Sequence, residues 1–210
     1  MIYIYYSYIS EDNFENLLEN ELSKFSSDYQ DKIKGYRRWQ DAQLSLLGRV
    51  ILFKAIEQVY KCKLNYKEIL QTKYNKPYFK DSLIQFNISH SGEIVVCALV
   101  EKSQVGIDIE IISDIQIDDF KWQMTEQEWL TITSSGKMME SFFAYWTQKE
   151  AVIKTHGHGL SIPLKTFEIS EDAAIINDQK FFLKEIKIDE KYKCYISLDM
   201  PIDELCIRKI

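Results

Sequence analysis

Apolar residues in this chain recur with the period of a strand, then with that of a helix, and then with that of a strand again. Residues 1–6 read as a strand, and the segments 14–25 and 44–59 have apolar residues three or four positions apart, as on one face of a helix. Two more strands are predicted at 85–89 and 94–100. The first half of the chain therefore predicts one strand, two helices and two strands.

The second half repeats this order with one additional strand. It begins with a predicted strand at 104–109 and continues with helices at 125–132 and 138–155. Residues 167–198 then alternate like a β-meander. We therefore predict an α+β fold of two pseudo-symmetric α/β halves, although the sequence has no visible self-repeat and no Gly-, Pro- or Ser-rich linker. The predicted halves are residues 1–103 and 104–210.

Composition narrows the class of protein and its partners. The 210 residues are 46% hydrophobic, which is enough for a substantial core, and 32 acidic against 26 basic residues give a net charge of −6. This balance argues against a nucleic-acid partner, which favours a basic surface. No apolar run reaches the roughly 18 residues needed to span a membrane, and no signal peptide is apparent. The cysteines have no CxxC spacing, so we expect reduced thiols and a cytoplasmic protein: Cys62, Cys97, Cys194 and Cys206.

Two carboxylates, Asp108 and Glu110, lie two positions apart in an apolar, β-branched run. Because side chains alternate along a strand, both should project from the same face. Such a pair on its own is more often a solvated strand edge than a metal site. Here Gly106 precedes the pair and would allow close approach of a backbone or ligand, and a hard cation such as Mg²⁺ would relieve the repulsion between the two charges.

Glu150 and Lys154 lie four residues apart in the second predicted helix of this half, so they share a helix face. On its own, this spacing indicates a surface ion pair that contributes a few tenths of a kcal/mol. Most of the neighbouring residues in this helix are apolar, however, and an acid among buried side chains needs a purpose.

Several other polar residues are each ambiguous. Ser89 and His90 precede a predicted turn at 91–92, where His90 is either a turn residue or a donor to a phosphate. Lys76 and Pro77 read as a turn, and the basic stretch 32–38 as a solvated helix face. His156 and His158 form an HxH pair, but zinc is disfavoured because no third nitrogen or sulfur ligand is evident.

The order and spacing of these motifs are more specific than any one of them. Residues 86–92 (FNISHSG), 106–110 (GIDIE) and 142–160, with the pattern FxxxWxxKEAxxKxxGxGL, together resemble the Sfp-type 4′-phosphopantetheinyl transferase superfamily. Asn75-Lys76-Pro77 resembles the Gly-Lys-Pro element of that family, with asparagine in place of glycine. The resemblance extends over residues of about 28 to 168.

The resemblance implies both an architecture and a reaction. Coenzyme A and Mg²⁺ would bind in a cleft between the two halves. The 4′-phosphopantetheine arm of coenzyme A would be transferred to a serine of an apo acyl or peptidyl carrier protein, releasing adenosine 3′,5′-bisphosphate. Because one chain supplies both halves, the resemblance also implies a monomer.

It also implies a role for each matching residue. Asp108, Glu110 and Glu150 would hold Mg²⁺ against the pyrophosphate, and Glu150, or a water that it orders, would accept the proton of the carrier serine. Lys154 would pair with the pyrophosphate. The remaining coenzyme A contacts would be Lys32, Ser89 and His90 near the 3′-phosphate and adenosine, and Lys76 and Pro77 at the adenine. Glu128, which forms a predicted capping box with Thr125, is a secondary candidate.

One departure from the family concerns the 3′-phosphate. The family often has an arginine in the long first-half helix, but residues 43–45 contain none. Arg37, Arg38 or Arg49 would then substitute for it. For the carrier, we expect a docking surface around residues 112–124 that relies on the apolar Trp122, since both proteins would be acidic.

Two other functions remain as alternatives. One is a catalytically silent coenzyme A-binding module on the same fold, which would have no chemical need of all four charged residues. The other is a Mg²⁺-dependent hydrolase of pyrophosphate-containing small molecules, which would use water and no protein partner. The sequence leaves open which pathway the carrier serves and whether acyl-coenzyme A is accepted.

Overall fold

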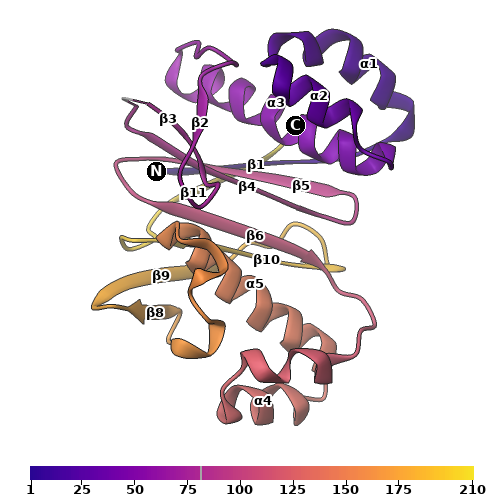
Figure 1. Ribbon diagram of the computed structural model, residues 1–210. Coiled ribbons are helices and arrows are strands. Elements are labelled where there is room, and N and C mark those ends of the chain that lie inside the picture. Colours follow the sequence, from indigo (N-terminus) through magenta and orange to yellow (C-terminus); the bar gives the residue numbers. More distant parts are fainter. Residues whose placement is uncertain (81) are drawn as a thin grey trace.

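The computed structural model describes residues 1–80 and 82–210, which form two large β-sheets with helices on their outer sides and one small two-stranded sheet (Figure 1). The first half contains β1 (Ile2–Tyr8), α1 (Glu11–Glu21), η1 (Leu22–Lys24), α2 (Ser27–Lys34), α3 (Trp39–Tyr60), β2 (Ile69–Gln71), β3 (Pro77–Phe79), β4 (Ile84–Ser91) and β5 (Ile94–Glu101). The second half contains β6 (Val105–Ile111), η2 (Ile117–Gln123), α4 (Glu126–Thr133), α5 (Met138–His156), η3 (Gly159–Ser161), η4 (Leu164–Thr166), β7 (Ile169–Ser170), β8 (Ala173–Ile176), β9 (Gln179–Glu185), β10 (Tyr192–Leu198) and β11 (Leu205–Lys209).

The α+β fold in two halves is confirmed, with several differences from the predicted elements. Of the basic stretch 32–38, only residues 32–34 are helical, at the end of the separate helix α2, and residues 35–38 lie outside any helix. The strands β2 and β3 pair in a small additional sheet. The hairpin turn is at Gly92 and Glu93 rather than at 91–92, because Ser91 still pairs with Ile94. The predicted meander at 167–198 consists of four antiparallel strands, β7 to β10.

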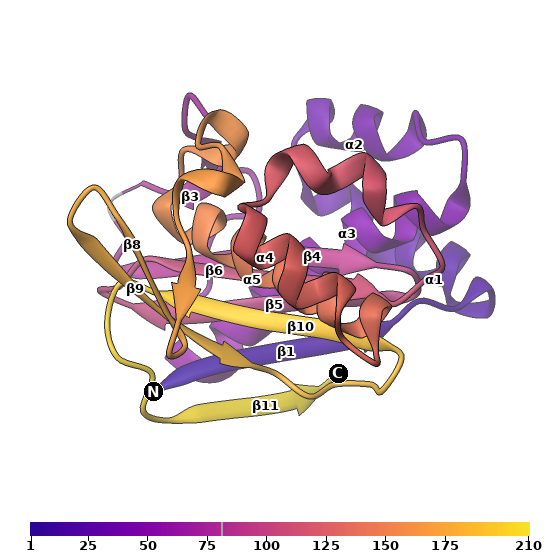
Figure 2. The same cartoon turned by 90° about the horizontal axis from the view of Figure 1, so that it is seen from below.

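A further difference is β11, which the sequence pattern did not predict. The first sheet has the order β11-β1-β5-β4, and the second has the order β6-β10-β9-β8-β7. The last strand of the chain therefore joins the sheet of the first half, where β11 runs parallel to β1 (Figure 2). The amide of Ile2 donates to Glu204 O at 3.0 Å, and that of Ile210 donates to Tyr6 O at 2.9 Å. The proposed division at residue 103 remains a prediction.

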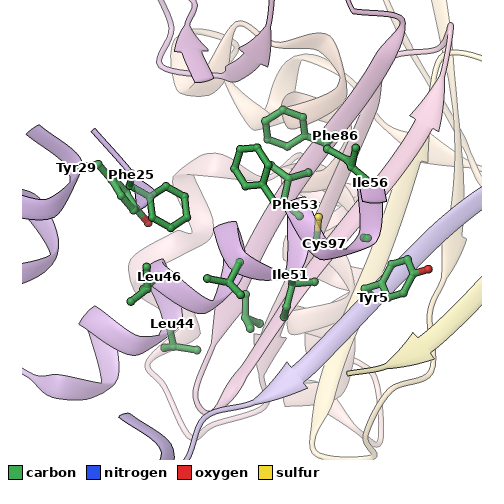
Figure 3. Packing of buried hydrophobic residues seen from close by; sticks show 14 of the residues in the cluster. Tyr5, Phe25, Tyr29, Leu44, Leu46, Ile51, Phe53, Ile56, Phe86 and Cys97 are labelled. Carbon is green, nitrogen blue, oxygen red and sulfur yellow. The ribbon is translucent and has the colours of Figure 1, made fainter. Parts of the chain in front are cut away.

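Alternation along the strands divides the core into layers. On β5, Val95, Cys97 and Leu99 face the helices of the first half, whereas Ile94, Val96, Ala98 and Val100 face the second sheet. Figure 3 shows the first of these layers, in which Phe53 and Ile56 of α3 lie near Phe86 and Cys97 of the sheet. The second layer lies between the two sheets and takes residues from both halves, including Val105, Ile107 and Ile109 of β6. Burial of this shared layer holds the halves together.

Two findings bear on the predicted class of protein. All four cysteines are free, with Cys97 and Cys194 buried and Cys62 and Cys206 half-buried. Among the described residues, no helix has both the length and the apolar character to cross a membrane.

Candidate active site

Alternation on β6 sends one set of side chains to the sheet core and the other toward α5. Val105, Ile107 and Ile109 belong to the core layer between the sheets, so Gly106, Asp108 and Glu110 lie on the opposite face, as the period of two predicted. At Gly106 the backbone of α5 comes very close. A Cβ atom there would stand 2.2 Å from the carbonyl oxygen of Ala151 and 2.4 Å from the amide nitrogen of Thr155.

Asp108 and Lys154 meet in this space. Asp108 is 3% exposed, and its Oδ1 lies 2.5 Å from Lys154 Nζ. Lys154 Nζ also donates to Ser89 Oγ at 3.0 Å and to the carbonyl oxygen of Ile107 at 3.3 Å, while Ser89 Oγ donates to Asp108 Oδ1 at 2.8 Å. Charge-assisted hydrogen bonds of this kind are about twice as strong as neutral ones. Three residues that lie far apart in the sequence thus form one buried polar cluster.

The edges of the two sheets are joined beside this cluster by side chains rather than by a backbone ladder. Asn87, Ser89 and Ser91 alternate along β4 and all face β6. Asn87 Oδ1 accepts from the amide of Ile107 at 2.9 Å. Ser91 Oγ accepts from the amide of Ile111 at 3.1 Å and donates to Glu110 Oε2 at 2.6 Å. We call these contacts of Asn87, Ser89 and Ser91 with β6 the seam. Their period-two spacing on a predicted strand was the signal that sequence reasoning missed.

Glu110 and Glu150 complete a group of three acids around one lysine. Burial raises the pKa of Glu110; the hydrogen bond from Ser91 lowers it, the charge of Asp108 raises it, and Lys154 lowers it. Burial also raises the pKa of Glu150, with Lys154 lowering it and Asp108 and Glu110 raising it. The charge of Asp108 therefore acts on both glutamates, and that of Glu110 also acts on Glu150. The structure brings together Ser89, Asp108, Glu110, Glu150 and Lys154.

In this structure the three acids are not close enough together to form a metal site. Within residues 1–80 and 82–210, no group of three or more His, Cys, Asp or Glu side chains is close enough to hold a metal ion. Asp108 Oδ1 is paired with Lys154, and Glu110 accepts from Ser91. Asp108 Oδ2, however, is buried and has no hydrogen-bond partner among the described residues. An unpartnered carboxylate oxygen beside two further acids fits a hard divalent cation.

His90 and Lys32 adjoin this cluster on the side of the first-half helices. His90 belongs to β4, on the face opposite to Ser89, and part of its ring reaches solvent. Its partial burial lowers its pKa, as do the charges of Lys154 and Lys32, whereas Asp41 raises it. Lys32 is exposed on α2. This part of the site is therefore positively charged and open to solvent.

Lys76 and Pro77 lie at the boundary between the halves where β6 begins and α5 ends. Lys76 Nζ donates to the carbonyl oxygens of Val105 and Thr155, each at 3.3 Å, and to Gln104 Oε1 at 3.4 Å. Burial lowers the pKa of Lys76 to about 8, with Asp199 opposing the shift. Lys76 thus bridges from the first half to the start of β6 and the end of α5. Pro77 begins β3 directly after it.

Glu128 is not part of the acidic cluster. Its carboxylate accepts from the amide of Thr125 at 2.9 Å, which confirms the predicted capping box, and pairs with Lys149 Nζ at 2.5 Å. Lys149 is completely buried and is a second residue that sequence reasoning missed. The signal for it was a lysine among apolar residues of a helix, read only as part of a motif. The structure therefore places Glu128, the secondary candidate, away from the acids, where α4 packs against α5.

The three candidate arginines differ in their surroundings. Arg49 is stacked on the ring of Tyr29, 3.5 Å from its centre, and burial lowers its pKa. That contact engages its guanidinium inside the first half. Arg37 and Arg38 are exposed, and Arg38 is the N-cap residue of α3. His156 and His158 contact each other, with ring centres 4.3 Å apart.

Comparisons with known proteins agree with this geometry. Residues 104–202 match the family model of the 4′-phosphopantetheinyl transferase superfamily, and residues 14–102 match the model of the 4′-phosphopantetheinyl transferase N-terminal region. The 4′-phosphopantetheinyl transferase gsp of Aneurinibacillus migulanus is 36% identical to this chain, over 93% of the chain and 84% of the relative. The chain belongs to the 4′-phosphopantetheinyl transferase superfamily.

Two further relatives show how widely this similarity extends. The 4′-phosphopantetheinyl transferase Sfp of Bacillus subtilis is 30% identical to this transferase over 88% of the chain and 89% of the relative. The L-aminoadipate-semialdehyde dehydrogenase-phosphopantetheinyl transferase of Mus musculus is 28% identical over 77% of the chain and 63% of the relative. The resemblance stated from the sequence motifs is thereby confirmed.

Proposed function

We propose that this transferase moves the 4′-phosphopantetheine arm of coenzyme A to a serine of an apo acyl or peptidyl carrier protein and releases adenosine 3′,5′-bisphosphate. The observation that carries the proposal is the buried Asp108 carboxylate, which Lys154 and Ser89 hold beside Glu110 and Glu150 at the boundary between the halves. Acids and a lysine in this arrangement suit a pyrophosphate with a divalent cation.

Asp108, Glu110 and Glu150 are the residues that we propose hold Mg²⁺. The unpartnered Asp108 Oδ2 supports this assignment, and so does the raised pKa of Glu150, which is due first to burial and further to the charges of Asp108 and Glu110. When bound, Mg²⁺ supplies positive charge against the pyrophosphate and its leaving oxygen. Lys154 compensates part of the negative charge of this group through its ion pair with Asp108.

Glu150 is the proposed general base. Burial raises its pKa, so its carboxylate is a stronger base than an ordinary glutamate. It would remove the proton from the carrier serine, either directly or through an ordered water. The serine oxygen then bonds to the β-phosphorus of coenzyme A as the bond from that phosphorus to the bridging oxygen breaks. Adenosine 3′,5′-bisphosphate leaves with the bridging oxygen, and Lys154 faces the pyrophosphate during this step.

The remaining contacts distribute the rest of coenzyme A along the boundary between the halves. We propose that His90 and Lys32 bind the 3′-phosphate, supported by the positive charges that already act on His90. Ser89 would contact the adenosine end, and Lys76 and Pro77 would border the adenine. The exposed Arg37 and Arg38 are free to add charge here, whereas Arg49 is engaged by Tyr29.

We propose that the carrier protein docks in a pocket one turn of α5 away from Glu150, the proposed general base. An apolar pocket of about 300 Å³ lies between η2, α5 and residues 162–165, which include the start of η4, and Trp122 in its lining is 71% exposed. We call it the Trp122 pocket. Its lining residue Trp146 precedes Glu150 by four residues on α5, so a carrier side chain seated here would bring its serine near that carboxylate. Lys165, also in the lining, suits an acidic partner. Trp122→Ala should raise the carrier KM while leaving the coenzyme A KM unchanged; an unchanged carrier KM contradicts this docking site.

Mass spectrometry tests the reaction directly. Apo carrier proteins from fatty acid, polyketide and nonribosomal peptide synthesis are incubated with the enzyme, coenzyme A and Mg²⁺, and a gain of one phosphopantetheine on the serine is expected for at least one of them. Asp108→Ala should abolish the gain, with partial recovery at high Mg²⁺. Consumption of coenzyme A without a carrier would instead identify a hydrolase, and binding without consumption a silent module.

We also propose that the enzyme acts as a monomer in the cytoplasm. The cluster of Ser89, Asp108 and Lys154 is assembled from both halves of one chain, so a second subunit is not needed to complete it. The four free thiols suit a reducing compartment. A sedimentation velocity profile with one species at the mass of 24.9 kDa is expected.

A further inference from the structure

Lys149 is a fully buried lysine that does not face the acidic cluster. Its ammonium lies 2.5 Å from Glu128 Oε1 and donates to two backbone carbonyl oxygens, that of Leu164 at 3.0 Å and that of Phe167. The rings of Phe167 and Tyr145 flank it, with centres 4.4 and 5.2 Å from Nζ. All of these partners lie in α4, in α5 itself or around η4.

These contacts tie together segments that have little regular structure of their own. Leu164 and Phe167 bracket the short η4 turn, and their carbonyl oxygens would lose a donor without Lys149. Glu128 fixes the start of α4 through its hydrogen bond with the amide of Thr125. Tyr145, beside the ammonium, donates its hydroxyl to the carbonyl oxygen of Gln123 at 3.0 Å and so holds the end of η2.

Two of these segments, η2 and η4, line the Trp122 pocket together with α5. Trp122 and Gln123 belong to η2, Trp146 belongs to α5, and the remaining lining residues are Ile162, Pro163, Leu164 and Lys165. Lys149 therefore lies behind the pocket and contacts each element that lines it, directly or through Tyr145. Among the described residues, the Lys149 ammonium makes no hydrogen bond or ion pair with Lys154 of α5 or with Asp108 of β6, which belong to the proposed coenzyme A site.

Stability alone does not explain why a lysine occupies this position. A buried ion pair can often be replaced by apolar residues of similar volume with little loss of stability, because burying two charges is costly. Burial indeed lowers the pKa of Lys149, although the hydrogen bond and charge of Glu128 oppose the shift. What an apolar residue cannot do is donate to the carbonyl oxygens of Leu164 and Phe167 and so fix the path of that segment.

We propose that Lys149 is a positioning residue for the carrier protein, which fixes the walls of the Trp122 pocket and thereby sets the affinity for the carrier without affecting coenzyme A. This inference rests on the proposed function and deepens it. Lys149 touches neither substrate. It acts through η4 and, by way of Tyr145, through η2.

Steady-state kinetics of Lys149→Met with both substrates is the first test. We expect the carrier KM to rise about tenfold, as for a well-packed interface anchor, and the coenzyme A KM to stay within about twofold. A role confined to folding would instead reduce the active fraction, so the maximal rate would fall with both KM values unchanged, and that result overturns the proposal. Lys137→Met is the matched control, because Lys137 pairs with Glu140 at the exposed start of α5.

The double variant Glu128→Gln/Lys149→Met protects the test against unfolding. The single change Lys149→Met leaves Glu128 as an uncompensated, partly buried charge, which is destabilising, whereas glutamine at position 128 removes that charge and still accepts from the amide of Thr125. We expect the double variant to regain thermal stability but to keep the high carrier KM. Recovery of a wild-type carrier KM together with stability would overturn the proposal.

Direct binding separates this inference from the proposed reaction. A carrier protein with its acceptor serine changed to alanine is titrated into wild-type enzyme and into both variants, and about tenfold weaker binding is expected for the variants. Wild-type enzyme that binds the carrier but transfers nothing contradicts the reaction and not the role of Lys149. Wild-type enzyme that transfers normally, with equal carrier binding by all three proteins, contradicts the role of Lys149.

Discussion

Gly106 determines how closely α5 can approach β6, and with it the contact between Lys154 and Asp108. A methyl group at this position would meet backbone atoms of Ala151 and Thr155, which cannot rotate away as a side chain can. We expect Gly106→Ala to lower the free energy of unfolding by about 1–3 kcal/mol or more, measured by urea denaturation. Gly136→Ala is the control, because nothing lies within 4 Å of its added Cβ. Equal stability of the two variants would show that α5 can shift without cost.

The pH dependence of stability contains a contribution from Lys76. Its pKa is about 8 in the folded protein and 10.5 ordinarily, so between these values the unfolded chain binds more protons at this group. The contribution of Lys76 to the free energy of unfolding therefore rises between about pH 8 and pH 10.5, by at most about 1.4 kcal/mol per pH unit. Below about pH 8 this contribution is constant. We expect Lys76→Met to remove this slope in urea denaturation at pH values from about 7.5 to 9.5. Parallel pH profiles of the two proteins would exclude the shift.

For single residues, the sequence predicted a side chain's position correctly where one strand or helix alone determines it. The common face of Asp108 and Glu110 follows from the strand period alone, and the capping box of Thr125 and Glu128 from local spacing. It failed where the partner comes from elsewhere in the fold. The Lys149 contact that engages Glu128 depends on how α4 packs against α5, a tertiary relation that no local pattern contains.

Among the elements, β11 is the most distant from its partner in the sequence. It contributes hydrogen bonds to β1 and covers the edge of the first sheet, and Ser7 Oγ donates to the carbonyl oxygen of Ile210 at 2.6 Å. Deleting residues 203–210 should lower the free energy of unfolding by about 2–5 kcal/mol, since each of several lost hydrogen bonds contributes about 0.5–1.5 kcal/mol. Ser7→Ala, which removes one contact and leaves the strand, should cost less than about 1 kcal/mol. Thermal melting of the three proteins checks this order.

Elements with strong periodicity were predictable, and β11 was not. The helix α5 and the hairpin β4–β5 were found from apolar spacing to within a few residues, because their own burial dictates that spacing. The strand β11 has five residues, largely exposed or half-buried, and takes its conformation from pairing with β1 across nearly the whole chain. Its sequence carries little signal of that pairing.

For the whole molecule, the core layer between the sheets makes the two halves dependent on each other. In a fragment of residues 1–103, the faces of β1 and β5 with Ile2, Ile4, Ile94 and Val96 would be exposed to water, and β1 would lack β11. We expect this fragment to show no dispersed amide NMR spectrum alone and to regain one on addition of residues 104–210. A cooperative unfolding transition of the isolated fragment would show instead that the halves are autonomous.

The seam helps to determine the register of β4 against β6, and so the alignment of the two halves. Any residue can join a backbone ladder, so a ladder tolerates a slip of two residues without a change in its chemistry. A slip of the seam does change its chemistry, because Asn87 accepts from the amide of Ile107, and Ser91 accepts from the amide of Ile111 and donates to Glu110. A slip by two in either direction would remove Asn87 from the amide of Ile107, and in one direction it would place Glu93 instead of Ser91 opposite Glu110. Residues 87, 89 and 91 therefore favour the observed register, and this register brings the acids of one half to the serines of the other.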